Sequence, residues 1–309
     1  MKKSLIAMIA GFVLCTAIRL YTIVACTDMT TGFYYHDSAL LCNILYYGAA
    51  ALTFVGAVIA ARFDEKGEFG RIAETDIMDG RAAVIGFGLL ISAMFAGYEG
   101  MAEAKTLTPS SMLMMADYAF AAGAAILAFI ILYKKEFKPF MGFILALGGA
   151  YFTARGINCF KERMVIASVS EYVIAALCAV GAAVTFLMFA RFLSGNSGKH
   201  TKKAMFGWGT ATAVMTLSSA AATALAHLTA PEEISRRITV SKREAELFFQ
   251  TVYGKDGYMM VYTPLVDIVT GLFIAAVLIT VLYAKHTEVA VNAEGTAESA
   301  EVMTDGTEE

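Results

Sequence analysis

The sequence predicts an all-α integral membrane protein with eight transmembrane helices, and two observations lead to that prediction. Hydrophobic residues make up 58% of the 309 residues and charged residues 17%, whereas soluble domains average roughly 45–50% and 25%. Eight apolar stretches are also long enough to cross a bilayer core, which needs about 20 helical residues. Their apolar runs are continuous rather than alternating, so they are not the strands of a membrane barrel.

The eight predicted spans are joined by short connections, except before the last one. The third span is the shortest, and its boundaries are the least well defined by the sequence. The spans are Ser4–Cys26, Ser38–Ala61, Ala82–Tyr98, Met112–Tyr133, Phe140–Ile157, Val165–Leu193, Met205–Leu228 and Met260–Ala284.

Lysine and arginine are distributed unequally between the two sides of these spans. The side that carries both termini holds 14 basic residues, whereas the three short connections on the other side hold Lys105, Lys161 and Arg163. By the positive-inside rule, both termini are expected to be cytoplasmic.

The N-terminus has a second interpretation, as a cleaved signal peptide. Lys2 and Lys3 precede an apolar run, and Ile23–Cys26 resembles a lipoprotein cleavage box. Arg19 interrupts that apolar run and argues against cleavage. Cleavage would leave seven spans and an outer N-terminus.

The two halves of the chain share short motifs in the same order, which predicts an internal duplication. Asp117 precedes Tyr133 by the same spacing that separates Asp267 from Tyr283. Each predicted unit has four spans, an even number, so both units face the same way and form a parallel repeat. The predicted units are residues 1–139 and 140–285, and the alternative is coincidence in a biased composition.

Five ionisable residues lie near the outer ends of predicted spans. An ionised side chain at membrane depth costs roughly 2.5–3.5 kcal/mol even on the lenient insertion scale, so such residues are candidates for function. They admit two interpretations, a polar pocket open to the outside or buried salt bridges that hold helices together. The five residues are Arg19, Asp117, Arg155, Glu171 and Asp267.

Other site chemistries lack support in the sequence. It contains no His-Glu-x-x-His, Gly-x-Ser-x-Gly or Cys-x-x-Cys motif, and its four histidines are scattered. We therefore expect no catalytic site, metal site or cofactor. The net charge of -3 offers no basic surface for nucleic acid. Cys26 and Cys159 both lie near outer span ends and could pair.

Two segments lie outside the predicted spans. The connection 229–259 is expected to form an outer helical cap, because Ser241 and Glu244 fit a capping box. The tail 286–309 has seven acidic residues and no lysine or arginine, so it is expected to be disordered in the cytoplasm.

The loop Asp28–Phe33, with Thr31 and Gly32 inside it, follows the helix that bears Arg19. This arrangement resembles uncharacterised multi-pass membrane proteins of anaerobic Gram-positive bacteria (Firmicutes). The resemblance covers this loop, Arg19 and the general helix layout. It implies a bacterial cytoplasmic membrane and no known activity.

Two functions fit these expectations. In the first, the protein is a small-molecule or ion transporter, in which Arg19 and Arg155 bind an anionic group. Asp117, Glu171 and Asp267 then carry coupling protons or balance the arginines. In the second, the protein is a non-catalytic membrane scaffold or sensor with structural ion pairs, and the cap or the tail contacts a partner.

Overall fold

The computed structural model describes residues 3–26, 38–65, 74–104, 110–134, 140–165, 170–195, 200–229, 238–239, 261–262 and 265–283. These residues form long helices, as predicted, and one short pairing in which β1 (Ile238–Thr239) runs parallel to β2 (Val261–Tyr262). The helices are α1 (Lys3–Cys26), α2 (Ala39–Glu65), α3 (Glu74–Glu103), α4 (Ser111–Lys134), α5 (Met141–Val165), α6 (Ser170–Leu193), α7 (Thr201–Thr229) and α10 (Leu265–Tyr283).

Among the described residues, seven helices are long and apolar enough to cross a membrane. The helix outside this group is α7, which corresponds to the predicted span Met205–Leu228. Its apolar character is reduced by buried hydroxyl residues, yet its side chains are mostly buried. The buried hydroxyl residues are Thr201, Thr210, Thr212, Thr216, Ser218, Ser219 and Thr223. Helix α7 is therefore an interior helix, shielded by its neighbours.

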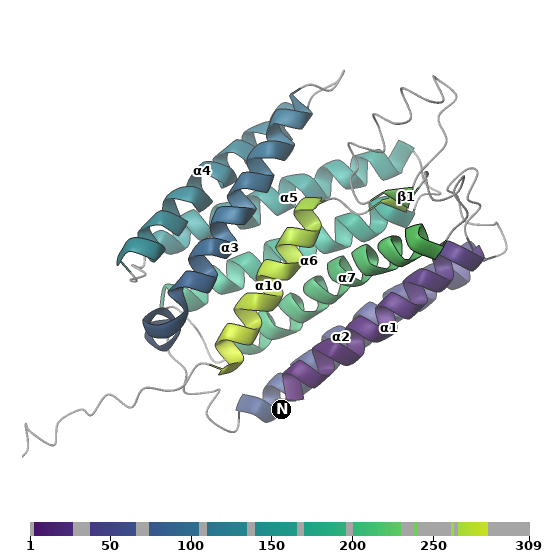
Figure 1. The fold of residues 1–309 in the computed structure, drawn as a ribbon, viewed down its shortest axis with the longest axis horizontal. Helices are drawn as coiled ribbons and strands as arrows, with labels where there is room; N and C mark the ends of the chain where they lie inside the picture. The colour runs from purple at the N-terminus through teal and green to yellow at the C-terminus, as the bar shows by residue number, and fades with distance from the viewer. Residues whose placement is uncertain are drawn as a thin grey trace, which may run out of the picture.

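Six helices close into a ring. Going round it, α3 packs against α4, α4 against α5, α5 against α6, α6 against α7, α7 against α10, and α10 against α3. The hairpin of α1 and α2 lies outside this ring and packs mainly against α7 (Figure 1). The described helices are thus grouped as six and two, and the boundary between the predicted units 1–139 and 140–285 runs through the ring.

Aromatic side chains fill the space between the ring helices. Phe120 of α4 stacks on Tyr151 of α5, with ring centroids 4.9 Å apart. Phe186 of α6 contacts Phe120 and Phe273 of α10, at 5.7 and 5.8 Å between centroids. Phe152 is 1% exposed and packs against the same rings. These five residues, which we name the aromatic plug, close the middle of the ring.

The end of α6 follows from local chemistry, and the end of α3 differs from the predicted one. Helix α6 ends where Gly195 takes a positive φ of 72°, which glycine adopts without steric cost. Helix α3 continues to Glu103, beyond the predicted end at Tyr98. The predicted capping helix from Ser241 and the tail 286–309 lie outside the described residues.

Helices α5 and α6 approach closely because glycine lies at their contact. A Cβ atom at Gly148 would lie 2.9 Å from Cε1 and 3.0 Å from Cγ of Phe186. The Phe186 ring is 2% exposed and belongs to the aromatic plug, so it has little room to move. Small residues allow this approach in membrane bundles, where van der Waals packing drives helix association.

We predict that Gly148→Ala destabilises the protein by about 1–3 kcal/mol, because the added methyl group overpacks the α5–α6 contact. The measurement is thermal unfolding of the purified protein in lipid nanodiscs. The matched control is Gly56→Ala in α2, where a Cβ atom meets nothing within 4 Å. Alanine is the better helix former, so this control should be neutral or stabilising. Equal melting temperatures for the two variants would contradict the prediction.

Candidate functional site

A buried arginine contacts two carboxylates at one end of the helix ring. Nη1 of Arg155 lies 3.1 Å from Oε2 of Glu99, and Nη2 lies 3.1 Å from Oδ1 of Asp267. Nη1 also donates a hydrogen bond of 3.2 Å to the Tyr151 hydroxyl. The side chains of Arg155 and Asp267 are 9% exposed, whereas that of Glu99 is 34% exposed. Glu99 is therefore the member of the cluster that reaches the surface.

Three ring helices bring these residues together. Glu99 lies in the last turns of α3, Arg155 in the C-terminal half of α5, and Asp267 in the first turn of α10. Because α10 runs antiparallel to α3 and α5, its start lies beside their ends (Figure 1). The first turn of a helix carries a partial positive charge that stabilises a carboxylate. Asp267 thus has two sources of positive potential, the α10 N-terminus and Arg155.

Asp117 and Tyr151 extend the cluster toward α4. Asp117 is 2% exposed and lies against α3, where a Cβ atom at Gly100 would be 3.0 Å from its own Cβ. Tyr151 interacts electrostatically with Arg155, Glu99 and Asp117. The Arg155 guanidinium thus contacts two carboxyl groups, Glu99 and Asp267, and Tyr151 lies between Arg155 and the third, Asp117. We name Glu99, Asp117, Tyr151, Arg155 and Asp267 the ring-mouth cluster.

The structure brings together three of the five predicted site residues, Asp117, Arg155 and Asp267. Arg19 is 1% exposed but lies in the α1–α2 hairpin, where it interacts electrostatically with Cys42 and Tyr46. Arg19 is therefore not part of the ring-mouth cluster that contains Arg155. Glu171 lies at the start of α6, and its side chain is outside the described residues.

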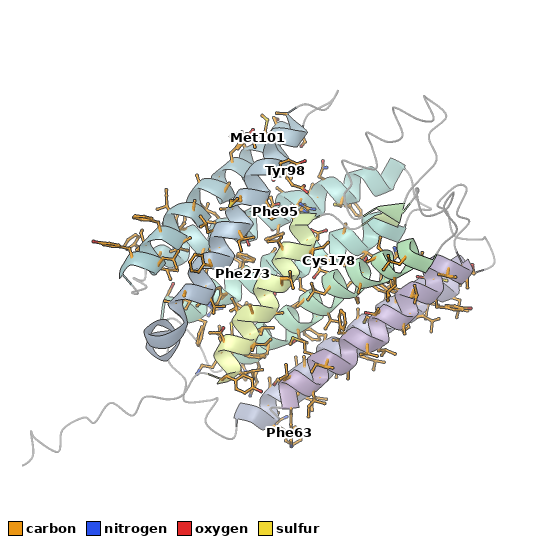
Figure 2. All side chains as sticks on the ribbon, viewed as in Figure 1. Phe63, Phe95, Tyr98, Met101, Cys178 and Phe273 are labelled. Carbon is orange, nitrogen blue, oxygen red and sulfur yellow. The ribbon has the colours of Figure 1, made fainter. Side chains whose placement is uncertain are left out.

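The five predicted site residues do not include Glu99, which follows directly after the predicted end of the third span at Tyr98. The helix continues past that point, so Glu99 stays in α3 and contacts Arg155. Figure 2 shows the neighbouring Phe95, Tyr98 and Met101 along this end of α3, near the start of α10. The apolar Met101 after Gly100 was the available sign that the span extends further.

The sequence left open whether Cys26 and Cys159 pair. All five cysteines are free thiols in the structure. Cys159 lies on α5 one turn after Arg155, and it interacts electrostatically with Cys178 of α6. Among the described residues, no group of three or more histidine, cysteine or acidic side chains is arranged to hold a metal ion.

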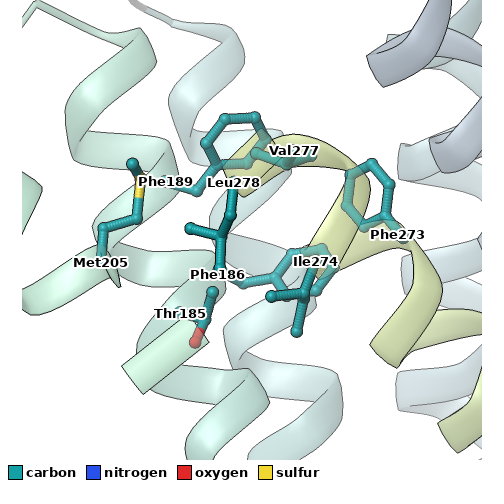
Figure 3. Close-up of a pocket in the computed structure, with 8 residues that line it drawn as sticks. All are labelled: Thr185, Phe186, Phe189, Met205, Phe273, Ile274, Val277 and Leu278. Atoms are coloured by element: carbon teal, nitrogen blue, oxygen red, sulfur yellow. The ribbon is translucent and has the colours of Figure 1, made fainter. Parts of the chain in front are cut away.

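A small apolar cavity lies deeper in the ring, between α6, α7 and α10 (Figure 3). Its volume is about 10 Å³, close to the minimum for one water molecule, which would also need polar partners. Phe273 lies about 9 Å along α10 from Asp267, at about 1.5 Å per residue. The cavity is separated from the ring-mouth cluster by the aromatic plug. It is lined by Thr185, Phe186, Phe189, Met205, Phe273, Ile274, Val277 and Leu278.

We predict that Arg155→Gln destabilises the protein by about 3–5 kcal/mol, because it leaves Asp267 buried without its cation. The double variant Arg155→Gln/Asp267→Asn should recover a large part of that loss, since the uncompensated carboxylate is also removed. Both are measured by unfolding of the protein in lipid nanodiscs.

The control for this pair is Arg191→Gln at the end of α6, where the arginine is exposed. An exposed charge contributes little to stability, typically below about 1 kcal/mol. If the double variant were as unstable as Arg155→Gln alone, charge compensation would not be the interaction that matters here.

Comparisons of the chain with protein families, with curated proteins and with solved structures gave no match. The resemblance suggested by Arg19 and the loop Asp28–Phe33 stays an expectation, and that loop lies outside the described residues. What can be stated of the chain itself is an all-helical protein with seven helices, among the described residues, that are able to span a membrane.

Proposed function

We propose that the protein is a proton-coupled transporter of a small molecule or ion in a bacterial cytoplasmic membrane, with the ring-mouth cluster as its outer site. One observation carries the proposal. Arg155 is shared by a buried carboxylate, Asp267, and by a carboxylate that is one-third exposed, Glu99. Ionisable residues inside membrane helices face the bundle interior and mark substrate and proton pathways in many transporters.

The number of charges supports proton binding. Among the described residues, the single positive charge of Arg155 contacts two carboxyl groups, those of Glu99 and Asp267. A surplus negative charge in a low-dielectric interior is costly, because Coulomb repulsion there is poorly screened. Carboxyl groups that share a site relieve the repulsion when one of them binds a proton. The cluster accordingly exchanges at least one proton with the outer solution.

Glu99 is the carboxyl group of the cluster that solvent reaches most easily. Its exposed fraction is 34%, whereas Asp267 is largely enclosed at 9%. A proton bound in the cluster weakens the attraction between its carboxyl groups and Arg155. The guanidinium is then able to bind an anionic group of a substrate from the outer side, while Asp267 holds Nη2 and fixes its orientation.

The aromatic plug supports a site with access from one side. Phe120, Tyr151, Phe152 and Phe186 are at most 2% exposed, and Phe273 is 4% exposed. The plug reaches from Tyr151, which is shared with the ring-mouth cluster, to Phe186 and Phe273, which line the small apolar cavity. Transport in this scheme requires the ring helices to move so that the plug opens, as in alternating access about a central site.

The membrane topology is part of the proposal. We propose that α7 is the eighth span, that both termini are cytoplasmic and that the ring mouth faces outward, as the lysine and arginine distribution indicates. We also propose that the two halves arose by duplication. The predicted equivalents contribute to the same cluster, since Asp267 of α10 contacts Arg155 and Asp117 of α4 interacts with Tyr151, although the α1–α2 hairpin breaks the two-fold pattern of contacts.

A second function has its own supporting observation. Arg155 contacts two carboxylates directly inside a closely packed bundle, and this geometry is also typical of structural ion pairs. In a scaffold or sensor, these contacts would pin α3, α5 and α10 together, and the tail 286–309 would contact a partner.

Proton movement in proteoliposomes distinguishes the two functions. We predict that liposomes with a pH-sensitive dye inside show protein-dependent proton uptake when one member of a panel of small carboxylates and inorganic phosphate is added outside. Glu99→Gln and Asp267→Asn should lower this uptake at least tenfold while folded yield stays near that of the wild type. Arg191→Gln serves as the control variant and should transport normally.

The scaffold function predicts the opposite pattern. Asp267→Asn would lower the folded yield, the exchange Arg155→Asp/Asp267→Arg would restore it, and no variant would change proton movement. Deletion of residues 286–309 separates the functions further, since it should leave transport unchanged but abolish partner binding.

Reporter fusions test whether α7 spans the membrane. We predict that a reporter active only in the cytoplasm works when it is fused after Gly198, in the connection before α7, and fails when fused after Glu246, in the connection after it. Equal activity at both positions would exclude α7 as a span, and with it the expected eight-span topology. A fusion after Lys285 should be active, because the chain end is expected to be cytoplasmic.

A further inference from the structure

Basic residues from three helices meet at the end of the bundle opposite the ring-mouth cluster. Lys3 begins α1, Arg62 lies in the last turn of α2, and Lys203 lies in the first turn of α7. The start of α1, marked N in Figure 1, lies away from the start of α10. Nζ of Lys3 is 4.4 Å from the ring centroid of Phe63, the residue after Arg62, so α1 begins beside the end of α2. We name Lys3, Arg62, Lys202 and Lys203 the basic end cluster.

Arg62 and Lys203 lie at the same level of two antiparallel helices, α2 and α7. These helices touch at Gly207, where a Cβ atom would lie 2.5 Å from Cγ2 of Val58. Val58 precedes Arg62 by four residues, and Gly207 follows Lys203 by four residues. Residues four apart share a helix face, so both cations lie one turn beyond this contact, on the faces that meet there. An anionic group at this position attracts both of them.

An exposed aromatic ring lies deeper along the same two helices. Trp208 is 37% exposed, and between Thr201 and Thr223 it is the one exposed residue of the otherwise shielded α7. Its ring packs edge-on against Phe54 of α2, with 5.0 Å between centroids. Trp208 follows Lys203 by five residues, about 7.5 Å along the helix axis. The headgroup region of a bilayer is about 5–7 Å thick on each side, so Trp208 lies at the depth of acyl chains when Lys203 lies among the headgroups.

The α6–α7 hairpin contributes positive charge without acidic residues. It contains no aspartate or glutamate from residue 172 to residue 231, and three lysines lie at its turn, between residues 199 and 203. Nζ of Lys202 is 5.9 Å from the ring centroid of Phe192 at the end of α6. Among the side chains that the structure describes, the acidic ones all belong to the ring-mouth cluster at the other end of the bundle.

We propose that the basic end cluster binds the headgroup of an anionic phospholipid, with an acyl chain of the same lipid against Trp208. Lysine and arginine residues near a membrane surface attract anionic lipids, each by about fivefold in affinity. Two other anionic segments compete for the cluster in the sequence, Asp64 with Glu65 and the tail 286–309. Neither supplies an acyl chain at the depth of Trp208, so the exposed tryptophan favours the lipid. The inference stands whether or not the ring-mouth cluster transports a substrate.

Quenching of tryptophan fluorescence tests the proposal. Trp208 is the only tryptophan in the chain, and bromine atoms on an acyl chain quench a tryptophan that they contact. The full-length protein is placed in phosphatidylcholine nanodiscs that contain a minor fraction of dibrominated phosphatidylglycerol or of dibrominated phosphatidylcholine. We expect the anionic lipid to be preferred at Trp208 by at least about fivefold. Equal quenching by both brominated lipids, or a preference that appears only after deletion of residues 286–309, would overturn the proposal.

Matched variants separate the basic end cluster from the general surface charge. Lys202→Gln/Lys203→Gln should lose most of the lipid preference. Lys134→Gln/Lys135→Gln removes the same charge at the end of α4, which packs against α3 and α5, and should keep the preference. Equal losses in the two double variants would contradict the proposal.

A last comparison distinguishes a lipid headgroup from free phosphate. Inorganic phosphate, added at constant ionic strength, should leave the lipid preference of the wild type unchanged. If inorganic phosphate abolished the preference, the cluster would be a site for free phosphate and the proposed lipid site would be wrong. The wild-type measurements need no variant, so they decide the matter even if a variant fails to fold.

Discussion

The interaction on which the rest of the structure depends is the contact of Arg155 with Glu99 and Asp267. A guanidinium group inside a membrane bundle must find counter-charges, because neither lipid nor the apolar core solvates it. Three helices from distant parts of the chain, α3, α5 and α10, supply the arginine and its two partners. This requirement brings α10 against α3 and so contributes to closing the six-helix ring.

The remainder of the ring shows how a bundle packs around such a cluster. Below the charges, the aromatic plug fills the centre with large rings, and glycine at positions such as Gly148 lets the helices approach. Helix α7 carries a series of buried threonines and serines. Some of these hydroxyl groups bond within the helix, as Thr216 Oγ1 does by donating to the Thr212 carbonyl oxygen at 2.9 Å. A helix of this kind is tolerated at membrane depth because its neighbours α1, α2, α6 and α10 cover it.

Much of the fold could be predicted from the sequence, because bilayer thickness sets the length of an apolar run. Seven predicted spans coincide with helices able to cross a membrane, with most ends shifted by a few residues. The site was harder to predict than the fold. The predicted third span ended at Tyr98 and left Glu99 out, although α3 continues to Glu103 and Glu99 contacts Arg155. Arg19 and Arg155 occupy similar depths in their helices, yet depth says nothing about which helices become neighbours. The ring arrangement is set by long-range packing, which the hydropathy of single segments does not contain.

The described residues of the ring-mouth cluster include more carboxyl groups than cations, and the proposed function requires that a proton neutralise part of this surplus. Infrared spectroscopy of the protein in lipid, recorded across pH, tests this directly through the absorption of protonated carboxyl groups. We expect an absorption band of protonated carboxyl groups that persists near neutral pH and responds to the pH of the outer solution. This band should vanish in the double variant Glu99→Gln/Asp267→Asn. If the carboxyl groups were fully ionised near neutral pH and the double variant left the spectrum unchanged, the cluster would be a purely structural ion pair.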